Sequence, residues 1–254
     1  MSVTSELNDH KFADYLATKV GKELLQTRSE LHSQGIVGKT LKDAGDKVAH
    51  DLIMLELNEH RPDDAVLSEE GKDDLERLSA ERVWIVDPLD GTREFSEVPR
   101  TDWAVHIALV ENNRPVAGAV ALPAQGITLS TDAPPVLPDQ ATALKVIVSR
   151  TRRPAPAIAL AGKLGAEYVE MGSAGAKAMA VVQGEADIYA HAGGQFEWDS
   201  CAPVAVAQAA GLHCSRIDGS EMLYNAEDPY LPDLLICRKD LAEKCLEILA
   251  GLEE

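Results

Sequence analysis

Residues 84–92 read Trp-Ile-Val-Asp-Pro-Leu-Asp-Gly-Thr, and the fold expected of the chain is built outward from them. The mostly apolar run 82–86 is rich in residues that favour β-structure, so it predicts a buried strand. Pro88 cannot donate a hydrogen bond to a neighbouring strand, and the strand is therefore expected to end at Asp87.

The turn after this strand carries two carboxylates and a helix start. Asp87 and Asp90 follow the apolar run, Gly91 gives the backbone freedom to turn, and Thr92 is expected to begin a short helix. Carboxylates at a strand end beside free helix N–H groups can hold a hard cation on one side and a phosphate on the other. Taken alone, the same residues could equally form a turn whose aspartates only cap the helix.

Two further acidic segments favour the cation site over the simple cap. Glu69 and Glu70 follow another short apolar run, 65–67. Glu197 and Asp199 precede a run, 201–210, that has a helical pattern. Adjacent strand ends and a helix start can bring these acids to one point.

These residue types indicate hydrolysis of a phosphate ester. A cluster of divalent cations stabilises both the attacking and the leaving oxygen of such a reaction, and magnesium takes oxygen ligands in octahedral geometry. A hydroxyl beside the metals, as in Thr92, could orient the attacking water, and Asp46 could accept its proton. Asp46 is expected in the first turn of a helix, where its alternative role is to interact with the helix dipole. A sufficient set of metal ligands is Glu69, Asp87, Asp90 and Asp199, with the carbonyl oxygen of Leu89.

The charge of the chain restricts its partners. With 24 basic and 42 acidic residues among 254, the formal net charge is −18. Sequence-independent binding to DNA, RNA or an anionic membrane requires basic surface, so these partners are not expected. A small phosphorylated substrate remains possible, because divalent metals reverse the local field.

Cysteine usage and hydropathy indicate a cytoplasmic protein. The four cysteines contain no Cys-x-x-Cys pair and are interpreted as reduced thiols. The polar segment 1–11 does not resemble a signal peptide, and no apolar run reaches the ~20 residues of a membrane span.

The order of apolar patterns predicts a layered α/β architecture in two halves, residues 1–135 and 136–254. Helices are expected over 7–31 and 44–60, followed by a β-hairpin, 103–110 and 116–122, and a strand at 127–130. The proline-containing segment 131–139 is the expected junction. In the second half, predicted strands (144–148, 166–169, 187–190, 234–237) alternate with predicted helices (154–164, 173–183, 203–210, 241–252).

Three other groups of residues are candidates with ordinary alternatives. Gly172 and Ser173 open a helix whose free N–H groups suit an anion, although Gly-Ser is also a common cap. The basic cluster Arg150, Arg152 and Arg153 suits a substrate phosphate, or is a solubilising loop. His106 lies inside a strand pattern and is interpreted as a buried, satisfied histidine rather than a ligand.

The motifs together resemble those of a known family. Residues 84–92 and the segment Glu197-Trp-Asp-Ser-Cys-Ala are similar to the two signature motifs of the inositol monophosphatase superfamily, and Ser68-Glu-Glu is similar to its third. The resemblance implies a five-layer α-β-α-β-α sandwich of the inositol monophosphatase and fructose-1,6-bisphosphatase type. It also implies dependence on Mg²⁺, with two to three ions per site, and inhibition by lithium. A homodimer is an expectation from the family alone.

Family roles follow residue by residue from the resemblance. Glu69, Asp87 and the Leu89 carbonyl would hold one metal, and Asp87, Asp90 and Asp199 a second, with a weaker third site near Glu69. Asp46 and Thr92 would activate the attacking water, and the N–H groups of Gly91 and Thr92 would hold the scissile phosphate.

The residues after the first motif resemble one branch of the superfamily more closely. Thr92-Arg-Glu-Phe, the run 103–109, Ser149-Arg150 and the segment 191–199 look like the CysQ branch in its actinobacterial form. That branch removes the 3′-phosphate of 3′-phosphoadenosine 5′-phosphate (PAP), and possibly of its sulfated form PAPS, in sulfur metabolism. The resemblance would assign substrate contacts to Gly91, Thr92, Ser149, Arg150, Gly172, Ser173, Lys177 and His191.

Other functions were weighed against this interpretation. The nearest is a sibling phosphatase acting on inositol monophosphate or fructose 1,6-bisphosphate, since only the substrate pocket would differ. A phosphatase of the haloacid dehalogenase type requires one residue between its aspartates, whereas Pro88 and Leu89 both lie between Asp87 and Asp90. A non-catalytic binding protein of the same fold is disfavoured because Asp46 and Thr92 are both present.

Overall fold

The computed structural model describes residues 7–73, 75–140 and 143–252, and the chain begins with two long helices, α1 (Asp9–Ser33) and α2 (Lys39–His60). Asn8 caps α1 by accepting a hydrogen bond from the amide of Lys11 at 2.9 Å. The first predicted helix is confirmed. The second begins five residues before the expected Ala44, so Asp46 lies beyond the first turn and the helix-dipole role expected for it there was wrong.

The first sheet contains five strands in the order β1-β2-β3-β4-β5. Their bounds are β1 Ala65–Ser68, β2 Arg82–Asp90, β3 Ala104–Glu111, β4 Arg114–Leu122 and β5 Ile127–Ser130. Only the β1–β2 pair is parallel. The predicted hairpin is confirmed, and its turn residues Asn112 and Asn113 have φ of 51° and 63°, as a type I′ turn requires.

Strand β2 does not end at Asp87 as expected, because Pro88 is accommodated in a β-bulge. Asp87 pairs with His106 and Asp90 pairs with Ala104, so Pro88 and Leu89 together face the single residue Val105. A bulge residue makes no ladder hydrogen bond, so the missing N–H of Pro88 costs nothing there. After the bulge, Gly91 (φ 86°) leads into the short helix α3 (Thr92–Ser96).

The second sheet also has five strands, in the order β7-β6-β8-β10-β9. Strand β6 pairs in parallel with β7 and β8, and β10 is antiparallel to both of its neighbours. The strands are β6 Lys145–Ser149, β7 Glu167–Met171, β8 Ile188–Phe196, β9 His213–Ser215 and β10 Tyr230–Cys237. The helices of this half are α4 Ala155–Leu164, α5 Ala174–Val182, α6 Glu197–Ala209 and α7 Lys239–Ala250.

Four elements of this half differ from expectation: strands β8 and β10 are longer than predicted, and α6 and β9 differ as follows. The helix predicted from residue 203 begins six residues earlier, at Glu197, so Asp199 lies inside its first turn. Strand β9 was not predicted, because its three residues are too few to show a pattern.

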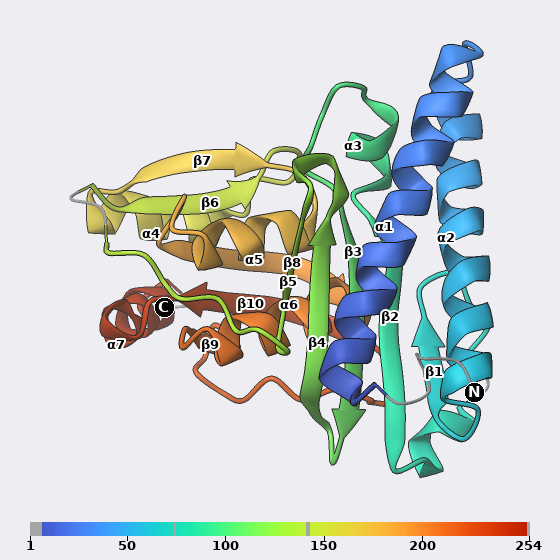
Figure 1. The fold of residues 1–254 in the computed structure, drawn as a ribbon. Coiled ribbons are helices and arrows are strands. Elements are labelled where there is room, and N and C mark those ends of the chain that lie inside the picture. The colour runs from blue at the N-terminus through green and yellow to red at the C-terminus, as the bar shows by residue number, and fades with distance from the viewer. Residues whose placement is uncertain (1–6, 74, 141–142, 253–254) are drawn as a thin grey trace.

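Helices and sheets stack in the order α-β-α-β-α (Figure 1). Helices α1 and α2 cover one face of the first sheet, α5 and α6 lie between the sheets, and α4 and α7 cover the outer face of the second. Each interface has its own buried apolar cluster, and the middle one combines residues from both sheets and from α5 and α6. The predicted layered architecture is confirmed. Among the helices of the described ranges, none is long and apolar enough to cross a membrane.

The first sheet ends at Ser130 and the second begins at Lys145. The predicted division near residue 135 therefore falls between the sheets. Because the middle core is shared, the division into two halves stays a prediction about chain organisation.

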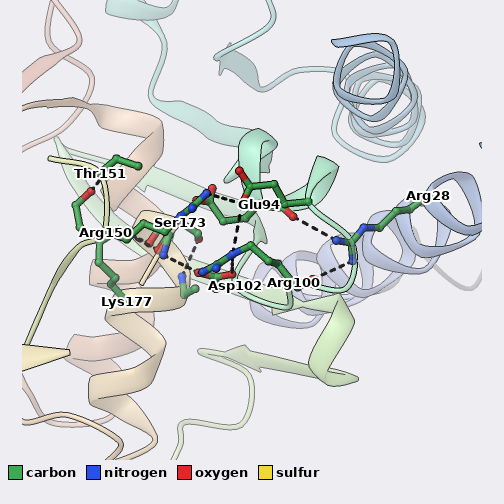
Figure 2. Close-up of polar contacts among 12 residues, drawn as sticks. Arg28, Glu94, Arg100, Asp102, Arg150, Thr151, Ser173 and Lys177 are labelled. Atoms are coloured by element: carbon green, nitrogen blue, oxygen red, sulfur yellow. Dashed lines mark hydrogen bonds and ion pairs between the residues drawn. The ribbon is translucent and has the colours of Figure 1, made fainter. Parts of the chain in front are cut away.

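Arg28 of α1 ties the outer helix layer to the segment after β2 (Figure 2). Its side chain is buried, and it donates to the carbonyl oxygens of Phe95 at 2.7 Å, Arg100 at 2.9 Å and Glu94 at 3.2 Å. Backbone carbonyls of α3 and of the segment after it thereby accept hydrogen bonds from a side chain of α1.

Replacing Arg28 by Met is expected to destabilise the protein by about 3 kcal/mol, because buried carbonyls would lose charged donors. Urea unfolding measures the change. Arg114→Met is the matched control, since Arg114 pairs with Glu221 at an exposed position and its loss is expected to leave the midpoint unchanged. Equal midpoints for both variants would contradict the structural role given to Arg28.

Candidate active site

Carboxylates from the end of β2 and the start of α6 meet between the two sheets. Oxygen atoms of Asp87, Asp90 and Asp199 all lie within 4.8 Å of one another. In a regular strand Asp87 and Asp90 would point to opposite faces, and the extra residue of the bulge brings them to the same side. Asp199 is held by the first turn of α6, where its Oδ2 accepts from the amide of Phe196 at 2.6 Å.

Glu69 completes this acidic group from the end of β1. Its amide donates to the carbonyl of Val86 at 3.3 Å, so β1 places it beside β2. Burial and the charges of Asp199, Asp90 and Glu70 together raise the pKa of Glu69 to about 7, against a hydrogen bond with Asp87 that lowers it. Burial, followed by the charges of Glu69 and Asp90, also raises the pKa of Asp87 well above its usual value.

Asp90 is balanced by its own partners. Burial opposes its ionisation, but His106 and Lys177 outweigh burial and lower its pKa. Asp90 Oδ2 lies 3.2 Å from His106 Nε2 and accepts from Ser173 Oγ at 2.5 Å and from the Gly175 amide at 2.7 Å. One oxygen is thereby fixed by the protein.

His106 is buried, as predicted, but its environment is not simply that of a core residue. Its Nδ1 donates to the carbonyl of Trp198 at 2.9 Å, which leaves Nε2 to face Asp90. A Cβ at Gly175 would lie 2.0 Å from that nitrogen, so only glycine fits there. Pattern reasoning missed this contact, because residues 90, 106 and 175 meet only in three dimensions.

Thr92 and Asp46 lie side by side next to the carboxylates. Thr92 Oγ1 is 3.4 Å from Asp46 Oδ1 and 3.2 Å from the carbonyl oxygen of Leu89. Burial raises the pKa of Asp46 to about 6, and the charge of Glu70 adds to the effect. A carboxylate with a pKa near neutrality beside a hydroxyl has the properties of a general base.

A polar cleft of about 250 Å³ opens beside the carboxylates. Asp90 and Asp199 lie at one end, and α5 and β8 form its walls. Five predicted substrate residues line it: Ser149, Gly172, Ser173, Lys177 and His191. Arg152 of the predicted basic cluster lines it too, as do residues that were not predicted, among them Arg93, Glu94, Thr151, Tyr189 and Gln195.

The arginine cluster is divided among different partners. Arg150 does not line the cleft; it donates to Glu94 at 2.5 Å and to Glu97 at 2.9 Å, and Figure 2 shows it beside Glu94. Arg153 pairs with Glu170 at 2.6 Å. Arg152 reaches the cleft and donates to the carbonyl of Gly194 at 2.8 Å. Position in the sequence could not separate these three arginines.

The amides expected to be free at the start of α5 are partly used by the protein. The Gly172 amide donates to Asp102 at 2.6 Å, and the Ala176 amide donates to Ser173 Oγ at 2.9 Å. With the Gly175 amide bonded to Asp90, three of the N–H groups at this helix start already face the protein's own oxygens. This helix start therefore offers fewer free N–H groups than expected, although Gly172 and Ser173 do line the cleft.

Lys177 provides positive charge in the floor of the cleft. Its ammonium group is buried and donates to the carbonyls of Gly172, at 3.1 Å, and of Ser173. Burial lowers the pKa of Lys177 to about 8, so the side chain remains mostly charged at pH 7. Together with Arg93 and Arg152 at the exposed rim, it makes this part of an acidic protein suitable for an anion.

The chain belongs to the inositol monophosphatase family, whose match covers residues 8–252. The predicted family is confirmed, and enzymes of this family depend on metal ions. Asp87 and Asp90, which are buried, offer hard carboxylate oxygen atoms together with Glu69 and Asp199, and this is the type of donor that such ions require.

Named relatives lie in the predicted branch of the family. A 3′-phosphoadenosine 5′-phosphate phosphatase of Mycobacterium leprae (strain TN) is 48% identical over 258 residues, covering 96% of this chain and 94% of that protein. The protein of the same name from Mycobacterium tuberculosis (strain CDC 1551 / Oshkosh) is 51% identical over 242 residues, covering 91% and 89%. The crystal structure of CysQ from Bacteroides thetaiotaomicron superposes with a TM-score of 0.76 at 28% identity, covering 89% and 96%.

Adding a divalent cation is expected to raise the melting temperature, because it relieves repulsion among the clustered carboxylates. At a concentration 100-fold above Kd, binding contributes about 2.7 kcal/mol, which corresponds to a shift of roughly 5–10 °C for a chain of this size. Thermal unfolding with and without Mg²⁺ measures the shift.

Asp87→Asn is expected to remove most of this shift without lowering the melting temperature of the metal-free protein. Asp218→Asn is the control, since it removes the same charge at a turn outside the site. A full shift in the Asp87 variant would show that the ion binds elsewhere.

Proposed function

We propose that this chain is a metal-dependent phosphomonoesterase that removes the 3′-phosphate of PAP and of PAPS, that is, a 3′(2′),5′-bisphosphate nucleotidase of sulfur metabolism. The observation that carries the proposal is the pairing of Thr92 and Asp46 beside carboxylates that border a polar cleft, whose lining also contains Lys177 and Arg152. The relatives at about half identity, which are named PAP phosphatases, support the choice of substrate.

The ions are proposed to be Mg²⁺, two to three per site, held by Glu69, Asp87, Asp90, Asp199 and the carbonyl oxygen of Leu89. Bound there, they would supply positive charge to the phosphate oxygens and acidify a water molecule. The orientation of Asp90, with one oxygen bonded to Ser173 and Gly175, leaves the other for an ion.

Thr92 and Asp46 are proposed to position and deprotonate the attacking water. When Thr92 donates its hydroxyl hydrogen to Asp46, a lone pair on Oγ1 remains to accept a hydrogen bond from the water. The proton can then pass through the hydroxyl to Asp46, whose pKa of about 6 suits a base at neutral pH. The amides of Gly91 and Thr92, at the start of α3, lack intrahelical acceptors and would hold the scissile phosphate.

The second phosphate of the substrate is proposed to lie near Lys177 and Arg152. Both line the cleft together with Asp90 and Asp199, so the cleft offers positive groups for a second phosphate besides its acidic residues. Ser149, Gly172 and Ser173 would contact the part of the substrate between them. Arg150 is proposed to act on the cleft only indirectly, through Glu94, with which it pairs.

The site is assembled from one copy of the chain. A homodimer is therefore a separate proposal, taken from the family alone. A cytoplasmic location is proposed on the four cysteines, all of which are free thiols in the structure.

Phosphate release from PAP, inositol 1-phosphate and fructose 1,6-bisphosphate, measured side by side with Mg²⁺, tests the substrate. We expect kcat/KM for PAP to exceed the other two values by at least about tenfold, because only PAP places a second phosphate next to Lys177 across a nucleoside. Inhibition by lithium is expected for each hydrolysed substrate. Equal rates on all three would replace the proposal with a broad-specificity phosphatase.

Asp46→Asn and Thr92→Val are expected to lower kcat for PAP by about 10²–10⁴-fold with KM changed little, since they remove proton transfer and not binding. Steady-state kinetics in saturating Mg²⁺ measures both constants. Asp43→Asn, an exposed acid on the same helix paired with Lys39, is the control. A large rise in KM without loss of kcat would contradict the roles given to Asp46 and Thr92.

A further inference from the structure

Two buried side chains in the wall of the cleft have polar atoms without a partner. Within the described part of the chain, His191 Nδ1 and Gln195 Oε1 are buried and make no hydrogen bond. The residues are only 4% and 5% exposed, and both line the cleft. A buried polar atom without a partner is destabilising, so a pair of them in one cavity indicates a ligand that completes their bonding.

The hydrogen bonds of His191 decide what its free nitrogen can bind. Gly193 and Gly194 have φ of 103° and 89°, and they turn β8 so that the carbonyl of Gly194 lies 3.1 Å from His191 Nε2. A carbonyl can only accept, so Nε2 carries the hydrogen. Burial lowers the pKa of His191 to about 4, so the ring is neutral at pH 7 and Nδ1 is an acceptor.

Gln195 presents a second acceptor. Its Nε2 donates to the hydroxyl of Tyr189 at 2.9 Å, which fixes the amide and leaves Oε1 directed away from that bond. Neither acceptor suits a phosphate, which has no hydrogen to donate when fully ionised. Both suit a neutral O–H or N–H group.

We propose that His191 Nδ1 and Gln195 Oε1 form a two-acceptor subsite for the nucleoside part of the substrate, where they bind a hydroxyl of the ribose or the exocyclic amine of the base. The inference rests on the proposed function, because it concerns the same cleft and the same substrate. In this arrangement Lys177 and Arg152 recognise the phosphate by its charge, and the subsite recognises the nucleoside by its neutral hydrogen-bond donors. It selects a nucleotide over a simple bisphosphate.

The binding of AMP, the nucleotide product, and of two of its analogues distinguishes the possible donors. AMP carries both donors, 2′-deoxy-AMP lacks the 2′-hydroxyl, and IMP lacks the exocyclic amine. Titration calorimetry in Mg²⁺ would measure Kd for each with the wild type, His191→Phe and Gln195→Met. The carbonyl of Gly194 keeps its bond from Arg152 in the histidine variant, so that variant leaves no backbone acceptor unsatisfied.

The wild type is expected to bind AMP about 3- to 30-fold more tightly than at least one analogue, the range for one hydrogen bond in a buried site. In one or both variants the affinity for AMP should fall by a similar factor, and AMP should no longer bind more tightly than that analogue. With PAP, KM should rise while kcat changes less than about threefold. A purely structural role would weaken all three nucleotides alike and leave the preference unchanged. His213→Phe, on the edge strand β9, is the control.

Equal affinity of the wild type for all three nucleotides, or no binding of AMP, would overturn the subsite. So would variants that keep the wild-type preference. If PAP is hydrolysed but the preference is absent, the subsite fails and the proposed function stands. If the preference is present but PAP is not hydrolysed, the subsite stands and the proposed function fails.

Discussion

The β-bulge at Pro88 and Leu89 is the constraint on which the site depends. Without it, Asp87 and Asp90 would lie on opposite faces of the first sheet and could not share an ion. The bulge also turns the Leu89 carbonyl toward Thr92, so one irregularity in β2 brings together two carboxylates, a carbonyl oxygen and a hydroxyl. Proline is suited to this position because the bulge requires no ladder hydrogen bond from it.

The pKa values of the acids around the bulge are shifted in opposite directions. Glu69 and Asp87 have raised pKa values because they are buried among other acids, whereas Asp90 is kept ionised by His106 and Lys177. The carboxylates suit cations, and Lys177 and Arg152, in the lining of the same cleft, suit an anion. A strongly acidic chain can in this way bind an acidic substrate.

Much of this could be predicted from the sequence, because the proposed metal ligands lie in short motifs and the sheets follow from alternating strands and helices. Pro88 was misleading, since a proline indicates the end of a strand unless the partner strand accommodates a bulge. The start of α2 was missed because Gly38 makes no side-chain cap. The partners of Arg150 and His106 come from distant segments, and no local pattern specifies them. Gln195 lies within the matched segment 191–199, but only its unpaired buried oxygen distinguishes it.

The contribution of Asp199 has a consequence for the order in which the protein is made. Glu69, Asp87 and Asp90 lie in the first sheet, which is complete by Ser130, whereas Asp199 belongs to α6, far along the chain. Closing that long loop is entropically costly and must precede completion of the ligand set. During synthesis the acids of the first sheet therefore leave the ribosome before Asp199 has been added to the chain. Cations that require Asp199 as a ligand cannot guide early folding, and they would stabilise only the completed, folded chain.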